Sequence, residues 1–349
     1  MQEEGLVELL SIKNLKTHYR TEKGILKAVD GVDLKISKGK ALGLIGESGC
    51  GKTTVAFSIL RLIPYLFKKA ESGHFRIVEK IISTGKIVDG EIRYKGKNLL
   101  ELPAKEMRAI RGKEISIILQ SSKSRMNPVF GIGYQIGEPK EAHEKIRWEK
   151  IRETVFEYLG KVEIADGKKR YRHDPQKFSG GEGQRIMIAM SLICNPYLLL
   201  ADEPTSSLDV TVQRQVLELM KRMKKEFDLS MLLMTHNLAV VAEMSDHVAV
   251  MYAGKIMEYG PVIPIFHNPK HPYTKGLIAA TPSLRGRKED FKFEGITGSP
   301  PDPYNPPSGC IFHPRCKYAD SLCKEVEPKL VEINSGYSVA CSKVYEIPG

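Results

Sequence analysis

Gly46-Glu47-Ser48-Gly49-Cys50-Gly51-Lys52-Thr53 is the stretch that decides the fold of this chain. The apolar run Ala41–Ile45 leads directly into it, and residues 53–62, which end before a proline, have the pattern of a helix. A strand, a glycine-rich loop and a helix in this order form the context that a phosphate-binding loop requires. Backbone N–H groups of such a loop point at phosphate oxygens, because glycines let the backbone approach closely. The stretch therefore predicts a binding site for a nucleoside triphosphate.

Two side chains of this loop predict how the phosphates are held. Lys52 adds a positive charge beside the β- and γ-phosphates, and the Thr53 hydroxyl can ligate Mg²⁺. A coincidental glycine-rich turn would lack the flanking strand and helix. The residues that we expect to contact the nucleotide here are Gly46, Ser48, Gly49, Cys50, Gly51, Lys52, Thr53 and Thr54.

An acidic pair follows another apolar run. Asp202 and Glu203 come directly after Leu198–Ala201, which is typical of a short buried strand. One carboxylate at a strand end can hold a metal through water, and the next can polarise the attacking water as a general base. We therefore predict that Asp202 contacts the metal and nucleotide and that Glu203 is the catalytic base. The alternative is a structural acidic pair that caps the next helix.

Two more polar residues follow predicted strands. Gln120 ends the run 115–119 and supplies a neutral oxygen, so we predict that it contacts Mg²⁺ and responds to the γ-phosphate. His236 follows residues 231–235 and is predicted to contact the γ-phosphate as a second catalytic residue. Either residue alone would be typical of a structural role, so the prediction for His236 depends on its position relative to Glu203.

Short buried strands alternate with helices, such as the one expected at residues 210–227, through the first part of the chain. This alternation predicts an α/β fold with a mostly parallel sheet and helices on both faces. Residues 6–19 and 25–36 are typical of edge strands, and residues 248–258 of a hairpin around Gly254.

Two segments interrupt this pattern. Residues 121–184 are helical and polar, which predicts an inserted helical subdomain, and residues 64–88 show mixed charge and little period, which indicates a further insertion. After Pro261, proline, histidine and cysteine become frequent. We therefore predict a nucleotide-binding domain over residues 1–260 and a small irregular C-terminal domain over residues 261–349.

The phosphate loop has a rarer companion, Phe178-Ser179-Gly180-Gly181-Glu182-Gly183-Gln184-Arg185. The loop, this stretch, the pair Asp202-Glu203, the stretch Ser207-Leu208-Asp209 and His236 resemble, in this order and spacing, the ATP-binding subunits of ABC transporters. The resemblance covers residues 6–260. It implies an ABC-type ATPase core with an antiparallel β part, ATP and Mg²⁺ as ligands, and ATP hydrolysis coupled to transmembrane transport.

In that family the serine–glycine signature caps the γ-phosphate bound to the opposite subunit. The resemblance therefore implies that Ser179 and Gly181 act in trans, and it places Gln184 in the same nucleotide-binding set. A serine and two glycines at a helix N-terminus suit this role, because they offer N–H donors and a favourable dipole. Tyr19 matches the aromatic residue that stacks on adenine. The alternative for Tyr19 is a strand aromatic packed in the core.

A narrower resemblance, to the oligopeptide and dipeptide importer ATPases, rests on three stretches: His271-Pro272-Tyr273-Thr274-Lys275-Gly276-Leu277, residues 201–213, and Met126-Asn127-Pro128-Val129. It implies membrane permease subunits as partners, and either a paralogous ATP-binding subunit or a second copy of this chain. An external substrate-binding protein would act indirectly. It also implies a peripheral location at the cytoplasmic face of the cell membrane. Sugars and metal chelates remain alternative cargoes.

Two departures from these families stand out. Cys50 occupies a position where serine is commoner, which the loop should tolerate because its backbone does the binding. Residues 121–125, after Gln120, lack the usual acidic-proline pair, which bears on the contact with the permease helix.

Four of the six cysteines lie in the proline-rich C-terminal region, at Cys310, Cys316, Cys323 and Cys341. Their spacing differs from common zinc fingers and from the tight run of bacterial ferredoxins. Four thiolates nevertheless indicate a tetrahedral metal site or a cluster, with four unrelated thiols as the alternative. Resemblance to the C-terminal extension of peptide importers favours a [4Fe–4S] cluster over Zn²⁺.

Composition limits the remaining alternatives. The net charge of +11 would suit nucleic acid or an anionic membrane surface, but it is also typical of a lysine-rich solvated surface. No apolar run approaches the length of a membrane helix, and no secretory pattern opens the chain. A nucleic-acid-associated ABC ATPase would need long heptads or two cassettes, so we predict no nucleic-acid partner. An ABC exporter subunit is the nearest alternative.

Overall fold

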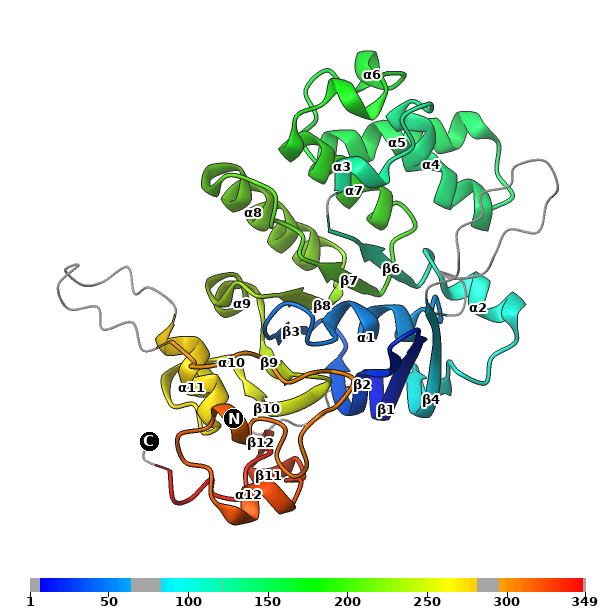
Figure 1. Ribbon diagram of the computed structural model, residues 1–349. Coiled ribbons are helices and arrows are strands. Elements are labelled where there is room, and N and C mark those ends of the chain that lie inside the picture. The colour runs from blue at the N-terminus through cyan, green and yellow to red at the C-terminus, as the bar shows by residue number, and fades with distance from the viewer. Residues whose placement is uncertain (1–6, 64–82, 121, 281–294, 348–349) are drawn as a thin grey trace. The chain divides into compact units, whose positions relative to one another are not determined.

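The computed structural model describes residues 7–63, 83–120, 122–280 and 295–347 (Figure 1). Contacts divide the chain into two compact units. The first unit comprises Met1–Leu9, Ile36–Ala41 and Glu101–Thr235, and the second comprises Leu10–Lys35, Leu42–Leu100 and His236–Gly349. Each unit is described by itself.

Three parallel strands form the sheet of the first unit. β6 (Ile115–Ile118) pairs with β7 (Leu198–Asp202), and β7 pairs with β8 (Ser230–Thr235). Every residue of β7 and β8 is buried, because a parallel strand is covered on both faces. This burial explains the unbroken apolar runs in the sequence, and it confirms the strands predicted there.

Helix α8 (Val210–Glu226) connects β7 to β8, as predicted. Its apolar side is buried through Val216, Leu217, Leu219, Met220 and Met223. Asp209 caps its N-terminus, where Oδ1 accepts a hydrogen bond from the backbone N–H of Val212 at 3.0 Å. A carboxylate at this position satisfies a first-turn N–H group and complements the helix dipole.

The remaining helices of the first unit include the predicted helical insertion, and Figure 1 shows α3 to α7 gathered together in green. They are α2 (Ala104–Ile110), α3 (Ser122–Arg125), α4 (Ile132–His143), α5 (Trp148–Lys161), α6 (Gly167–Arg170), the 3-10 turn Pro175–Lys177 and α7 (Gly180–Leu192). The helical pattern predicted for residues 121–184 is therefore present, apart from residue 121, which lies outside the described residues. Helix α7 continues beyond residue 184.

An antiparallel sheet of the second unit has the strand order β2-β1-β4-β5. Its strands are β1 (Glu8–Thr21), β2 (Gly24–Ser37), β4 (Ser83–Tyr94) and β5 (Lys97–Asn98). The prediction of an insertion with little period over residues 64–88 was wrong for residues 83–88, which belong to β4, the strand that pairs with β1. Pairing between distant segments imposed a strand that local pattern did not show. Residues 64–82 lie outside the described residues.

The phosphate loop of the second unit lies between β3 (Ala41–Ile45) and α1 (Lys52–Ile59). β3 runs parallel to β9 (His247–Tyr252), which forms the predicted hairpin around Gly254 with β10 (Lys255–Pro261). Helix α1 ends earlier than the predicted residue 62, because Arg61 adopts a left-handed backbone with φ +51°. Helix α9 (Leu238–Met244) precedes β9.

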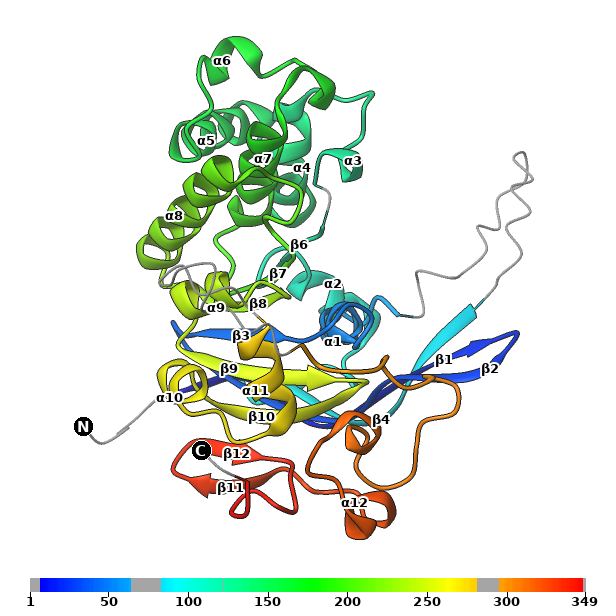
Figure 2. The same cartoon turned by 60° about the vertical axis from the view of Figure 1, so that its left-hand side comes forward.

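The C-terminal region adds strands to the sheet of the second unit that contains β3, β9 and β10 (Figure 2). Its elements are α10 (Val262–His267), α11 (Pro272–Ala279), the 3-10 turn His313–Arg315, α12 (Ser321–Glu325), β11 (Val331–Asn334) and β12 (Tyr337–Val339). β12 pairs with β10, with Glu258 opposite Val339. The buried Glu258 carboxylate accepts hydrogen bonds from Tyr337 Oη and from the backbone N–H groups of Lys270 and His271.

No helix within the described ranges combines the length and apolar character that a membrane span needs.

Candidate functional site

Close approach of neighbouring strands explains two glycines of the phosphate loop. A Cβ on Gly46 would lie 2.1 Å from the carbonyl oxygen of Met251, and one on Gly51 would lie 2.2 Å from that of Ala28. Gly51 is also the N-cap of α1, with a left-handed φ of +112°. Glycine at both positions is therefore required by packing as well as by the backbone path.

Lys52 is buried at the start of α1, and the loop itself surrounds its ammonium group. Nζ donates to the carbonyl oxygens of Gly46 at 2.8 Å and Glu47 at 3.1 Å. Ser48 and Thr53 are exposed beside it. A helix N-terminus with a lysine and exposed loop N–H groups is an arrangement that binds phosphate.

Two more predicted residues flank the loop. Cys50 is buried, and burial raises the pKa of its thiol, so the side chain behaves as a small neutral group. Tyr19 Oη lies 3.4 Å from Thr54 Oγ1, and burial raises the pKa of its phenol. The structure therefore brings Tyr19 to the first turn of α1.

The predicted acidic pair ends β7 in the first unit. Asp202 is buried, whereas Glu203 adopts a left-handed backbone with φ +47°. The N–H of Glu203 donates to the Met234 carbonyl at 2.8 Å, and its Oε2 accepts from Thr235 Oγ1 at 3.1 Å. A non-glycine residue in this conformation costs about 1 kcal/mol, and such strain concentrates at functional sites. The turn holds the Glu203 carboxylate at the carboxyl ends of β7 and β8, where α/β sheets bind ligands.

Gln120 is connected to this turn. Its Nε2 lies 3.4 Å from Ser206 Oγ, and Ser206 Oγ donates to the carbonyl oxygen of Glu203 at 3.3 Å. The exposed amide thus reaches the segment that positions the predicted base. His236 directly follows β8 and precedes Asn237, the N-cap of α9.

The serine–glycine signature forms the N-terminus of α7. Ser179 Oγ accepts from the Glu182 N–H at 3.2 Å, and Glu182 Oε2 accepts from the Ser179 N–H at 2.9 Å. Arg170 pairs with the same carboxylate and lowers its pKa. This reciprocal capping fixes the helix end while Ser179 and Gly180 stay exposed.

Two other residues of the signature, Gly181 and Gln184, pack against their surroundings. A Cβ on Gly181 would lie 2.4 Å from Val212 Cγ1, so α7 and α8 approach closely there. Gln184 is buried within α7.

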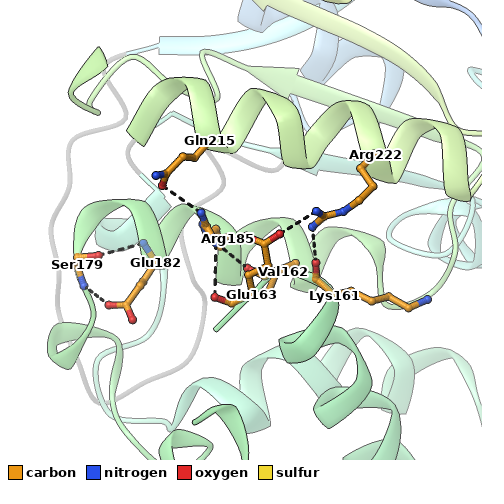
Figure 3. A network of polar contacts seen from close by, with 8 residues as sticks. All are labelled: Lys161, Val162, Glu163, Ser179, Glu182, Arg185, Gln215 and Arg222. Atoms are coloured by element: carbon orange, nitrogen blue, oxygen red, sulfur yellow. Dashed lines mark hydrogen bonds and ion pairs between the residues drawn. The ribbon is translucent and has the colours of Figure 1, made fainter. Parts of the chain in front are cut away.

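Glu163 links this helix to its neighbours, as Figure 3 shows. Its Oε2 accepts from Arg185 Nη1 at 2.9 Å, and its Oε1 accepts from Arg222 Nη1 at 2.8 Å. Arg185 also donates to Gln215 Oε1, and Arg222 donates to the carbonyl oxygen of Lys161. The hydrogen bond from Arg222 is the largest cause that lowers the pKa of Glu163. The network therefore connects the end of α5 with α7 and α8.

The four C-terminal cysteines, Cys310, Cys316, Cys323 and Cys341, line one pocket. All four are free and partly buried. Burial raises the pKa of the Cys310 thiol to about 11, and it also raises the pKa of Cys316 and Cys341. Within the described parts of the chain, no group of three or more ligating side chains is placed to hold a metal ion. The four thiols therefore share one pocket, and their role as metal ligands stays a prediction.

Comparison with known proteins decides the family. Residues 29–206 match the ABC transporter family, and residues 257–323 match the oligopeptide/dipeptide transporter C-terminal region. The Bacillus subtilis dipeptide transport ATP-binding protein DppD is 41% identical over 334 residues, which cover 96% of this chain and 94% of that protein. The chain belongs to the ATP-binding subunits of ABC transporters.

Further relatives agree with this assignment. The oligopeptide transport ATP-binding protein OppD of Bacillus subtilis is 42% identical over 334 residues, 96% of this chain and 88% of the relative. Among solved structures, a dimeric ATP-binding cassette bound to ADP and phosphate has a TM-score of 0.60 at 23% identity, covering 73% of this chain and 99% of that chain. The latter likeness confirms the cassette fold, with its mixed sheets and helices. As an ABC ATPase the chain hydrolyses ATP.

Two residues of this ABC ATPase were missed by sequence reasoning. Arg315 forms an ion pair with Glu47 of the phosphate loop. It follows His313, which lines the cysteine pocket, by two residues. Glu163 organises the network behind the signature. Neither lies in a motif, although the isolated arginine between Cys310 and Cys316 was a signal that the C-terminal region could have offered.

Proposed function

We propose that this chain is the ATP-hydrolysing motor subunit of a peptide importer, and that two cassettes close around ATP. The observation that carries the proposal is the capped N-terminus of α7. Ser179 Oγ accepts a hydrogen bond from Glu182, so its own O–H proton can be donated to a phosphate oxygen. Because Ser179 and Gly180 are exposed, this end can reach a nucleotide on another cassette.

The roles of the residues follow from their chemistry. The loop from Gly46 to Thr53 holds the phosphates, Tyr19 stacks on the base, and Thr53 and Gln120 offer the oxygen ligands that Mg²⁺ prefers. Asp202 supports the metal through water. Glu203 accepts a proton from the attacking water, and His236 contacts the γ-phosphate.

A dimer explains why the signature and the loop are both needed. ATP would be bound by the loop of one cassette and capped by Ser179, Gly181 and the helix containing Gln184 of the other. The similar cassette that was solved as a dimer with ADP and phosphate supports this arrangement. The second cassette would be a paralogous subunit or another copy of this chain.

The proposed partners are membrane permease subunits, and the cargo is a dipeptide or oligopeptide delivered by an external binding protein. The names of the relatives support peptides as cargo. Exposed apolar side chains close to Gln120 in sequence, Val129, Phe130 and Tyr134, offer a docking surface for a permease segment. The protein would then lie peripherally at the cytoplasmic face of the membrane.

The domain boundaries are part of the proposal. Residues 1–260 would form the ATP-binding domain, with its helical subdomain at about 121–184, and residues 261–349 would form the importer extension. The start of the second family match at residue 257 supports a boundary there.

Replacing Glu203 by glutamine tests the motor. We expect Glu203→Gln to bind MgATP and to accumulate as a closed dimer, while phosphate release falls by roughly a hundredfold or more. Light scattering after size exclusion measures the dimer, and Glu153→Gln, an exposed change on α5, serves as the matched control. Undiminished hydrolysis, or a variant that stays monomeric with MgATP and its natural partner, would contradict the proposal.

We further propose that the cysteine pocket holds a [4Fe–4S] cluster in a structural role, with Zn²⁺ as the alternative. Four thiols on one pocket fit either group chemically, since both are bound by thiolates. Anaerobically purified protein should be brown and should contain iron and sulfide, and Cys316→Ser should remove both. Cys194→Ser is the control, because that cysteine lies outside the pocket. A colourless protein with stoichiometric zinc would overturn the iron assignment.

A further inference from the structure

We infer that Arg315 of the C-terminal region is a positioning residue for the phosphate-binding loop, and that it acts by holding Glu47. The inference rests on the proposed function only in taking residues 46–53 as the site of the ATP phosphates. It gives the C-terminal region a direct part in nucleotide binding.

The contact is a two-pronged ion pair. Arg315 Nη1 donates to Glu47 Oε2 at 2.8 Å, and Nη2 donates to Oε1 at 3.1 Å. The arginine side chain is 5% exposed and the glutamate side chain 29% exposed. A fork of parallel hydrogen bonds adds geometric specificity to the attraction of the charges. The pair therefore fixes the direction of the Glu47 side chain and not only its distance.

Other contacts fix the arginine itself. Its Nε donates to the carbonyl oxygen of Thr297 at 3.0 Å, and Nη1 also donates to Tyr252 Oη at 3.2 Å. The guanidinium lies 5.7 Å from the centroid of the Tyr252 ring. An arginine held from several directions is a rigid support, because few of its rotamers satisfy all these partners.

The other end of the pair is attached to the phosphate-binding machinery. The Glu47 carbonyl oxygen accepts from Lys52 Nζ at 3.1 Å, and the Glu47 N–H donates to Tyr273 Oη at 3.1 Å. Tyr273 is fully buried in α11, so it also belongs to the C-terminal region. Arg315 and Tyr273 of that region thus hold Glu47. The carbonyl oxygen of Glu47 in turn accepts a hydrogen bond from the phosphate-binding Lys52.

A pair at this place has a consequence for binding. The loop must keep its N–H groups and Lys52 in one arrangement, and an arrangement fixed before the ligand arrives costs less entropy on binding. When Arg315 is removed, the Glu47 side chain loses its anchor, and the backbone carbonyl that accepts from Lys52 is held less firmly. The expected effect is on nucleotide affinity rather than on the chemical step.

The experiment compares Arg315→Lys and Arg315→Gln with the wild-type full chain. We expect the KM for ATP to rise about tenfold in Arg315→Gln, with a smaller change in kcat, because a misplaced loop weakens binding first. Arg315→Lys should be intermediate, since lysine keeps the charge but loses the fork. Arg93→Gln is the matched control, because Arg93 pairs with Glu91 on the exposed surface of β4. Binding of a fluorescent ATP analogue checks affinity independently of turnover.

The loop side of the pair provides a second test that leaves the C-terminal region unchanged. Glu47→Gln should raise the KM for ATP in the same direction, and the double variant Glu47→Gln with Arg315→Gln should be no worse than Arg315→Gln alone. Wild-type nucleotide affinity in the Arg315 variants, or additive effects in the double variant, would overturn the inference. A wild-type chain that neither binds nor hydrolyses ATP would overturn the proposed function as well, so the two failures are distinguishable.

Discussion

Two ion-pair systems of this ABC ATPase use similar side chains in different surroundings. In the second unit, the buried Arg315 forms a fork with the partly buried Glu47. In the first unit, Glu163 is shared by Arg185 and Arg222, and Glu163 and Arg222 are about half exposed. Solvent screens exposed charges, so distances near 2.8 Å in both places correspond to different energies. Burial, rather than the length of the contact, decides how firmly each system holds its segment.

The largest effect is expected from leaving a partly buried carboxylate without its partner. Arg315→Met should lower the free energy of unfolding by about 3 kcal/mol, because Glu47 would lose both hydrogen bonds in a site with limited access to water. Urea unfolding of the full chain measures the change. Arg93→Met, on the exposed face of β4, is the control. If Arg315→Met lost no more stability than this control, burial would not distinguish the two ion-pair systems.

A smaller effect is expected where helix α7 of the first unit is held against α8 by packing and not by charge. Gly181→Ala should lower the free energy of unfolding by about 1–2 kcal/mol, because its methyl group would collide with Val212. Gly180→Ala is the control, since a Cβ there would lie 3.6 Å from Leu208, an ordinary contact distance. Equal stabilities of the two variants in urea would show that α7 and α8 can separate freely.

The exposed network should contribute less. Glu163→Gln should lower the free energy of unfolding by about 0.5 kcal/mol, in line with exposed ion pairs, and the difference should shrink in about 1 M salt. Glu153→Gln serves as the control on α5. A loss as large as that of Arg315→Met would mean that this network holds α7 as firmly as a buried pair does.

The smallest effect concerns pH. The pKa of Glu163 is lowered in the folded protein, so its contribution to stability is present above the unfolded pKa of about 4.3 and is lost as the pH falls through the folded value. The difference in urea midpoint between wild type and Glu163→Gln should therefore be full at pH 7 and should shrink as the pH falls below the unfolded value. A difference that grows as the pH falls would have the wrong sign for this account.

Local pattern was sufficient for the elements that position the nucleotide. The strands β3, β7 and β8 appeared as apolar runs because they are buried on both faces, and the glycine loop could be placed from the strand before it. The hairpin around Gly254 and the helix α8 were predicted for similar local reasons. The roles of individual site residues remain predictions.

Features that depend on distant contacts were not predictable in this way. Residues 83–88 form a strand because β1 pairs with them, and nothing in their own pattern required it. Arg315 meets Glu47 across 268 positions of sequence, and Glu163 gathers arginines from two later helices. Such partners are chosen by the assembled fold, so a motif cannot contain them.

The pairing of β12 with β10 has a consequence for protein engineering. Strand β12 covers β10, and its Tyr337 supplies a hydrogen bond to the carboxylate of Glu258 inside the sheet. A chimaera that exchanged the tail of this chain for that of another transporter would uncover a sheet edge and expose it to aggregation, unless the graft brought a matching strand and phenol. The tail is therefore not an interchangeable module.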